Sequence, residues 1–171
     1  LVVFSSRAAS QVSITHVNVV DVESETVRAD RTVVIEADRI RAITTSAPAG
    51  ARTIDARGAY MIPGLWDMHV HLGMGGRSAL ALLVANGVTG VRDMGGKFDL
   101  VRSWRDSVTA GTLVGPRIEM TGPIVENARW LSAVRGILEQ TGDTAAVRDL
   151  SERIPVATPE EARAAVARVA A

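Results

Sequence analysis

The sequence predicts a mixed α/β chain made of a β-rich segment over residues 11–62 and alternating strands and helices over residues 63–171. Two observations support this. Before residue 62 the apolar runs are rich in β-branched residues and bounded by polar turns. After it, strand-length apolar runs alternate with longer segments of helical period. Such alternation implies parallel strands joined by right-handed crossovers.

The composition narrows the class of partner. The 171 residues include 19 basic and 19 acidic side chains, and this balance argues against nucleic acid or an anionic membrane surface. No cysteine is present, which excludes disulfides and thiolate metal sites within these residues. No apolar run has the length of a transmembrane helix. We therefore expect a small-molecule or short-peptide substrate, no nucleic acid and no membrane span.

The two ends of the chain are unusual. Residues 1–10, "LVVFSSRAAS", are compatible with a signal-peptide remnant or with a frayed terminus, so both a cytoplasmic and an exported location stay open. At the other end, "TPEEARAAVARVAA" stops at Ala171 without a glycine or proline. Both ends therefore look cut.

The β-rich segment contains the runs "QVSITHVNVVDV" and "RTVVIEADRIRAI", with turns expected at residues 36–38 and 56–58. It is too small to bury much area unaided, so we expect it to pack on another part of the protein. The following region predicts three strands and two helices, at residues 65–72, 77–87, 88–94, 98–111 and 116–122.

Residues 123–157 interrupt this alternation, with only a short helical run near "TAAVRDLSER", and we expect a functional loop or lid there. The final helix has a clear start. Thr158 is the expected N-cap, Pro159 the first helical residue and Glu161 the partner in a capping box.

The strand "LWDMHVHL" carries polar residues where a buried strand should be apolar. Because side chains alternate along a strand, Asp67, His69 and His71 are expected on one face. The other face, expected to pack beneath helices, has Trp66, Met68, Val70 and Leu72. Buried polar groups need partners, and two imidazoles about 7 Å apart along a strand can converge on one divalent ion.

The position of the two histidines agrees with this interpretation. A glycine-rich stretch at residues 73–76 follows His71, so the pair lies at the carboxyl end of its strand, which is the catalytic face of a β/α barrel. The alternative is a pair of partly exposed histidines satisfied by water.

An all-β start followed by "GAYMIPGLWDMHVHLG" resembles the amidohydrolase superfamily of metal-dependent hydrolases. The stretches "NGVTGVRDMGG", "GPRIEMTGPI" and "VATPEEARAAVARVAA" are similar to its imidazolonepropionase-like and Xaa-Pro-dipeptidase-like branch. The resemblance covers nearly the whole chain. It implies the N-terminal part of a (β/α)8 TIM-like barrel: a small β-sandwich subdomain over 11–62, then three β/α units over 63–171 with an insertion at about 123–157.

The resemblance also implies roles for residues. His69 and His71 would bind one or two divalent ions, most often zinc. The family further needs a lysine after a fourth strand, two later histidines and an aspartate as general base, all expected beyond Ala171. Lys97 is not a substitute, because it follows the second strand and opens a helix, and His16 lies in the β-rich start.

The expected function is metal-dependent hydrolysis of a C–N bond in a dipeptide, an acylated amino acid or a cyclic amide, by a longer parent enzyme that is either a monomer or a homo-oligomer. The fragment alone would be inactive. The alternative is a complete, non-catalytic binding or interaction module.

Two carboxylates near the histidines have open roles. Asp67 would either orient an imidazole or bond the backbone, and Asp93 would either line the active-site mouth or serve a loop or N-cap role.

Overall fold

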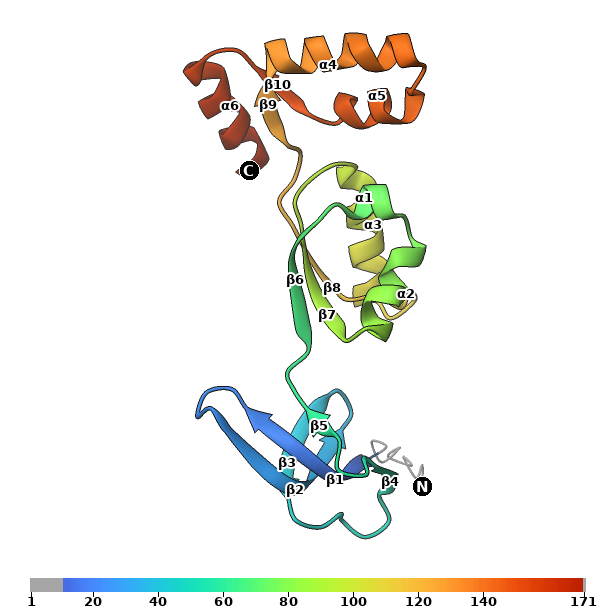
Figure 1. The fold of residues 1–171 in the computed structure, drawn as a ribbon. Coiled ribbons are helices and arrows are strands. Elements are labelled where there is room, and N and C mark those ends of the chain that lie inside the picture. Colours follow the sequence, from blue (N-terminus) through green and yellow to red (C-terminus); the bar gives the residue numbers. More distant parts are fainter. Residues whose placement is uncertain (1–10, 171) are drawn as a thin grey trace, which may run out of the picture. The chain divides into compact units, whose positions relative to one another are not determined.

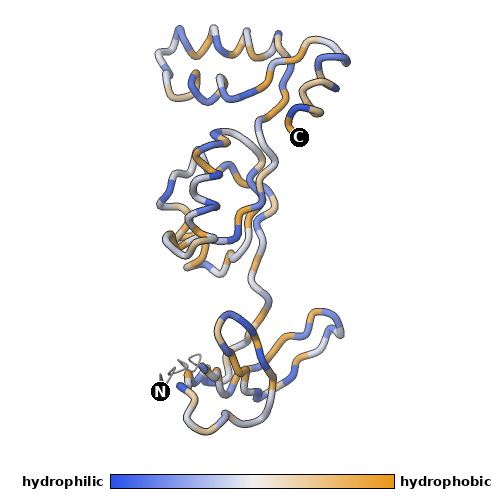
Figure 2. The backbone as a smooth tube through the Cα atoms, turned by 180° about the vertical axis from the view of Figure 1, so that it is seen from behind, coloured by the Kyte–Doolittle hydropathy of each residue, from blue (hydrophilic) through white to orange (hydrophobic). Residues whose placement is uncertain are grey.

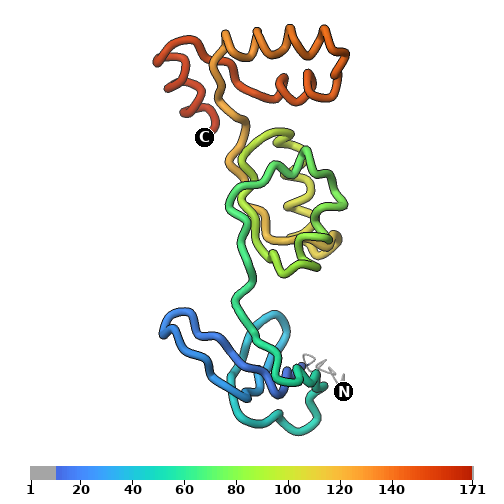
Figure 3. The backbone as a smooth tube through the Cα atoms, viewed as in Figure 1, coloured from blue at the N-terminus to red at the C-terminus, as the bar shows by residue number. Residues whose placement is uncertain are grey.

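The computed structural model of this chain describes residues 11–170, so the expectation for residues 1–10 lies outside the described residues. The chain divides into two compact units, with the division between Pro63 and Gly64 (Figure 1). Figure 3 follows the backbone through both units.

The first unit is a single five-stranded sheet. Its strands are β1 (Gln11–Asp21), β2 (Thr26–Glu36), β3 (Arg39–Thr44), β4 (Arg52–Asp55) and β5 (Tyr60–Met61). They run in the order β3-β2-β1-β4, and β5 also pairs with β1. The all-β prediction is confirmed.

The expected β-sandwich is not observed within residues 11–63. The strand β1 pairs in parallel with β4 along its first half and with β5 along its second half, while β2 pairs antiparallel on the other side. All five strands therefore join one layer instead of forming two, and the buried side chains of this sheet are few, with Val17, Val33 and Val34 the apolar ones.

The second unit contains the alternating elements predicted from the sequence. Three parallel strands lie in the order β6-β7-β8: β6 (Leu65–Val70), β7 (Val88–Asp93) and β8 (Arg117–Met120). The helices between them are α1 (Leu72–Gly75), α2 (Ser78–Ala85) and α3 (Phe98–Thr109). The one-turn helix α1 was not predicted. Within residues 11–170 this sheet does not close into a barrel.

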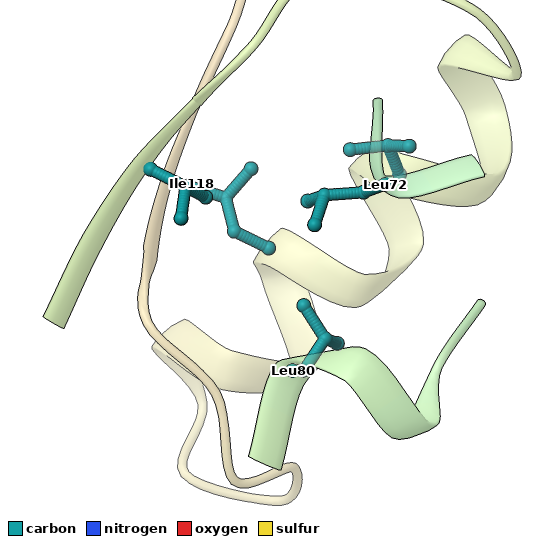
Figure 4. Close-up of a cluster of buried hydrophobic side chains, with 5 residues drawn as sticks. Leu72, Leu80 and Ile118 are labelled. Carbon is teal, nitrogen blue, oxygen red and sulfur yellow. The ribbon is translucent and has the colours of Figure 1, made fainter. Parts of the chain in front are cut away.

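A compact apolar core joins this sheet to its helices. Leu72, Leu80, Val91, Val101 and Ile118 are all nearly inaccessible to solvent and contact one another (Figure 4). They come from α1, α2, β7, α3 and β8, so the helices cover one face of the sheet. This core fixes the strand ends from which the candidate site is built.

The segment after β8 is more regular than expected. It contains β9 (Val125–Asn127), α4 (Ala128–Thr141), α5 (Thr144–Ser151) and β10 (Ile154–Val156). The short helical run corresponds to α5, but the 14-residue helix α4 and the parallel β9/β10 pair were missed. Apolar and polar residues are interleaved along α4 (Figure 2).

Side-chain caps and one left-handed glycine explain why α4 and α5 form where they do. The Asn127 side chain accepts a hydrogen bond from Trp130 N at the start of α4, and Gly142 ends that helix at φ 75°. Asp143 then accepts one from Ala146 N and begins α5.

The last helix, α6 (Pro159–Ala170), begins as predicted. Thr158 Oγ1 accepts a hydrogen bond from Glu161 N at 3.2 Å, and Glu161 Oε2 accepts one from Thr158 N at 3.3 Å. The capping box is confirmed. Among the described helices, none is both long and apolar enough to cross a membrane.

Candidate metal centre

The strand that carries the histidines is not regular. Asp67 pairs with Val91 and Val70 pairs with Asp93, so three steps along β6 match two along β7. The extra residue forms a bulge at Met68 and His69. Bulges of this kind re-aim side chains at strand ends.

The bulge overturns the predicted alternation. By register, Asp67 lies beside Val91 and Ile118, which belong to the core beneath the helices. His69 lies in the bulge itself, and His71 lies beyond the end of the strand. Asp67, His69 and His71 therefore do not share one strand face.

The prediction for Trp66, Met68, Val70 and Leu72 as one apolar, helix-covered face was half wrong. Val70 and Leu72 do pack in the core, but Trp66 and Met68 are 41% and 51% exposed. Trp66 lies in register with Gly90 and Arg117, on the face away from the helices. A methyl group at Gly90 would lie 2.3 Å from its indole, and the Arg117 guanidinium lies 5.8 Å from the ring centre.

The two imidazoles nevertheless lie close together. Their ring centres are 5.4 Å apart, and the planes meet edge to face at 74°. His71 precedes α1, and its Nδ1 lies 3.0 Å from the carbonyl oxygen of Gly95. Because a carbonyl can only accept, Nδ1 is the donor and Nε2 of the neutral ring carries the lone pair. This is how a metal-binding histidine is normally oriented.

Gly95 was not singled out from the sequence. The signal that could have found it is the "DMGG" sequence, because an aspartate at a strand end with glycines two and three residues later is typical of a tight turn. Gly95 has a φ of 103°, which a residue with a side chain rarely adopts.

Asp93 holds the backbone around His71. Its side chain is buried, with Oδ1 accepting a hydrogen bond from Leu72 N at 2.8 Å and Oδ2 one from Gly95 N at 3.2 Å. Leu72 follows His71, and Gly95 supplies the carbonyl that orients its ring. The buried carboxylate is thus hydrogen-bonded to the backbone of both segments, which is the loop role, and it does not line the mouth of the site.

Asp67 also bonds the backbone. Its Oδ1 accepts a hydrogen bond from His69 N at 3.1 Å, across the bulge. The bulge is further held by Arg92, whose Nε donates to the carbonyl of Met68 at 3.0 Å. Neither carboxylate has a hydrogen bond to an imidazole among the described residues.

The two histidines alone do not make a metal site. Within residues 11–170 no group of three or more His, Cys, Asp or Glu side chains could hold a metal ion. A catalytic zinc normally takes three protein ligands and keeps an open position. His69 and His71 can therefore supply part of such a site.

The other sequence candidates lie elsewhere. Lys97 is the residue that precedes α3, as predicted. His16 lies within β1, where its exposed ring contacts Asp30 Oδ1 at 3.1 Å.

Comparisons of the sequence with protein-family models and with curated proteins give no match. Solved structures do match. A prolidase solved with N-methylphosphonate-L-proline has a TM-score of 0.70 and 24% identity, over 94% of this chain and 44% of that chain. An Xaa-Pro dipeptidase with bound methionine in its active site has a TM-score of 0.57 and 28% identity, over 69% and 34%.

Phenylurea hydrolase B gives a TM-score of 0.60 and 27% identity, over 77% of this chain and 37% of that chain. The chain thus spans between about a third and less than half of the length of these proteins. The match supports the resemblance stated from the sequence, and it extends over the β-sheet unit and the partial parallel α/β unit. The chain is similar in structure to the N-terminal portion of prolidases, Xaa-Pro dipeptidases and related amidohydrolases, and is related to those enzymes.

Proposed function

We propose that this chain contributes the first part of a metal-dependent hydrolase that cleaves a C–N bond in a short peptide or another amide. In this proposal residues 11–62 are the β subdomain and residues 63–170 the first three β/α units, with residues 123–157 inserted. His69 and His71 are two of the metal ligands.

The observation that carries the proposal is the geometry of the histidine pair. The rings lie 5.4 Å apart at the carboxyl end of β6, and the Gly95 carbonyl fixes the His71 ring so that its Nε2 is free. The relatives support it too, because a prolidase, an Xaa-Pro dipeptidase and a phenylurea hydrolase all take their names from hydrolysing C–N bonds.

A bound zinc ion would supply a Lewis acid and lower the pKa of bound water toward neutrality. The residues of this chain prepare the ligands for it. Asp93 fixes the backbone on both sides of the His71 ring, and Asp67 and Arg92 fix the bulge that presents His69. We place the remaining ligands and the general base elsewhere in the full-length enzyme.

The test is metal content and hydrolysis in the full-length protein, purified with zinc and measured against a panel of Xaa-Pro dipeptides, N-acyl amino acids and phenylureas. We expect His69→Ala and His71→Ala each to lower bound zinc and to abolish hydrolysis. His16→Ala is the matched control, because it removes the third histidine of the chain from an exposed position on β1.

Unchanged zinc content and unchanged hydrolysis in both variants would contradict the proposal. A folded wild-type protein that binds no zinc and hydrolyses nothing would favour the alternative, a non-catalytic binding module.

A further inference from the structure

A cavity of about 690 Å³ lies within the second unit, between α3, the turn that follows β8 and the ends of α5 and α6. This volume lies in the range of cavities that hold small ligands. Part of its wall is apolar and is formed by Phe98, Met120, Ile154 and Val169. Three guanidinium groups supply the positive charge of the wall, and they belong to Arg105, Arg153 and Arg168.

The cavity lies apart from the histidine pair. Met120, in its wall, stands in one row with Asp93 on β7 and Val70 on β6. Neighbouring strands are about 4.8 Å apart, so two strand spacings of about 10 Å separate this wall from the end of β6. Neither His69 nor His71 lines the cavity. A ligand bound here would therefore not occupy the candidate metal centre.

Arg153 carries a donor that the fold leaves without an acceptor. Its Nη1 donates to Glu126 Oε2 at 3.3 Å, and its guanidinium lies 5.6 Å from the centre of the Trp130 ring. These two contacts hold the side chain in place. Its Nε–H is buried and has no hydrogen-bond partner within residues 11–170. A buried donor without an acceptor is unfavourable, so a ligand oxygen placed beside Nε would be stabilised.

The other two guanidinium groups also have donors to offer, since each guanidinium carries five N–H groups. Arg105 uses Nε and Nη2 for Asp106 Oδ1, at 3.0 and 2.9 Å, which leaves its Nη1 available. Arg168 makes no ion pair with any residue of the described part of the chain. One carboxylate, that of the exposed Glu152, lines the same wall. The wall therefore offers more charged donors than acceptors.

A glycine allows the end of α6 to approach the other walls. Gly122, in the turn after β8, has a φ of 87°, and a Cβ built there would lie 2.9 Å from Val169 Cγ1. Any side chain at position 122 would push α6 away. The glycine thus brings the last turn of α6, and with it Arg168, to the cavity.

We propose that this cavity binds a phosphate group, carried either by inorganic phosphate or by a monoester of a small apolar alcohol. A phosphate monoester has three outer acceptor oxygens and nearly two negative charges, so it can meet three guanidinium groups at once. A carboxylate has two oxygens and one charge and would leave more of these donors unpaired. The apolar body of an ester would pack against Phe98, Met120, Ile154 and Val169. This site does not depend on the proposed hydrolysis.

The test is calorimetric titration of the full-length protein with phenyl phosphate, inorganic phosphate and benzoate. We expect phenyl phosphate to bind about 10-fold or more tightly than benzoate, because benzoate leaves at least one charged donor unpaired. Inorganic phosphate that binds as tightly as phenyl phosphate identifies the free ion as the ligand, and weaker binding identifies the ester. Benzoate that binds as tightly as phenyl phosphate would overturn the inference.

Variants assign the binding to the arginines. Arg153→Gln and Arg168→Gln should each weaken the binding of phenyl phosphate about 10-fold, because each removes charge-assisted hydrogen bonds. Arg168→Lys keeps the charge and should lose less. Arg168 is exposed on α6, so its replacement tests the site even where Arg153→Gln prevents folding. Arg163→Gln is the matched control, because Arg163 is exposed on the same helix and lies outside the cavity wall.

A second control separates this cavity from a metal-bound phosphate. The double variant His69→Ala/His71→Ala should bind phenyl phosphate as the wild type does, since neither histidine lines the cavity. Loss of binding in that variant would place the phosphate at the histidines and overturn the inference. Unchanged affinity in both Arg153→Gln and Arg168→Gln would overturn it as well.

The two proposals fail separately. Phosphate binding that requires the arginines, in a protein that holds no zinc and hydrolyses nothing, would keep the cavity assignment and remove the hydrolase. Hydrolysis that requires His69 and His71, in a protein that binds no phosphate, would do the reverse.

Discussion

The carboxylate of Asp93, at the end of β7, accepts a hydrogen bond of 2.8 Å from the backbone N–H of Leu72, at the start of α1. The same carboxylate accepts a second bond from Gly95 N. One buried side chain thus joins the two backbone segments that position the His71 ring.

Replacing Asp93 should lower the free energy of unfolding more than replacing an exposed aspartate does. We expect Asp93→Ala to lower the free energy of unfolding by about 1–3 kcal/mol, because it leaves buried N–H groups without an acceptor. Asp93→Asn should cost less, since one oxygen remains. Urea denaturation measures the difference. Asp99→Ala is the control, because its side chain is 85% exposed and pairs with Arg102 at the surface. An equal loss in the free energy of unfolding for Asp93→Ala and Asp99→Ala would show that the Asp93 carboxylate does not hold the two backbone segments together.

Gly90 should be replaceable only when Trp66 is small. A Cβ at position 90 would lie 2.3 Å from the Trp66 ring, so Gly90→Ala should lower the free energy of unfolding by about 1–3 kcal/mol. In a Trp66→Leu background the same change should cost much less. A double-mutant cycle from denaturation curves gives the coupling. If Gly90→Ala lowers the free energy of unfolding equally in both backgrounds, residue 90 and the Trp66 ring are not in contact.

Gly136 should respond in the opposite direction. It lies inside α4, and a Cβ built there would meet no atom within 4 Å. Gly136→Ala should therefore raise the free energy of unfolding by about 0.5–1 kcal/mol, since alanine loses less conformational freedom in a helix. Thermal unfolding followed by circular dichroism checks this, and a lowered midpoint would show that α4 is not helical at this position.

The start of α6 offers a fourth stability test. Thr158→Ala should lower the free energy of unfolding by about 0.5–2 kcal/mol, because Glu161 N loses its acceptor. Thr158→Ser, which retains the hydroxyl, should restore most of the loss. If serine and alanine at this position give the same denaturation midpoint, the cap does not form in solution.

The Asp21 carboxyl should titrate below its ordinary range. A hydrogen bond from the Ser24 backbone N–H is the main cause that lowers its pKa, and the Ser24 side chain, Glu23 N and Arg28 act in the same direction. The stability that this turn gains is present above the ordinary pKa and is lost as the pH falls through the folded value. NMR titration of the folded and the urea-unfolded protein should show a lower pKa in the folded form.

Much of the fold was predictable because its signals are local. Thr158, Pro159 and Glu161 lie within four positions and specify a helix start without help from distant contacts. The caps of α4 were equally visible, as Asn127 and Gly142, but the interior Gly136 weakened the helical pattern and the segment was interpreted as a loop.

The prediction for the strand that carries the histidines, β6, was wrong for a different reason. A prediction of alternating faces assumes that no residue is inserted, and one bulge shifts every later side chain to the other face. The bulge at Met68 and His69 is stabilised by a hydrogen bond from Arg92 to Met68, 24 positions apart in the sequence. The sequence around Met68 and His69 therefore does not predict the bulge. The position of the pair at the strand end was predictable, whereas the direction of each ring depended on the long-range contact to Gly95.

The parallel β9/β10 pair brings the two ends of the α4–α5 segment side by side, with Val125 opposite Ile154. The chain between these strands therefore begins and ends at neighbouring positions. Such a segment can be lengthened, shortened or exchanged without moving α6 or β8, since loop closure changes little with length. Evolution can therefore vary this module independently of the sheet, and a chimaera that swaps residues 128–153 for the matching piece of another protein should still fold.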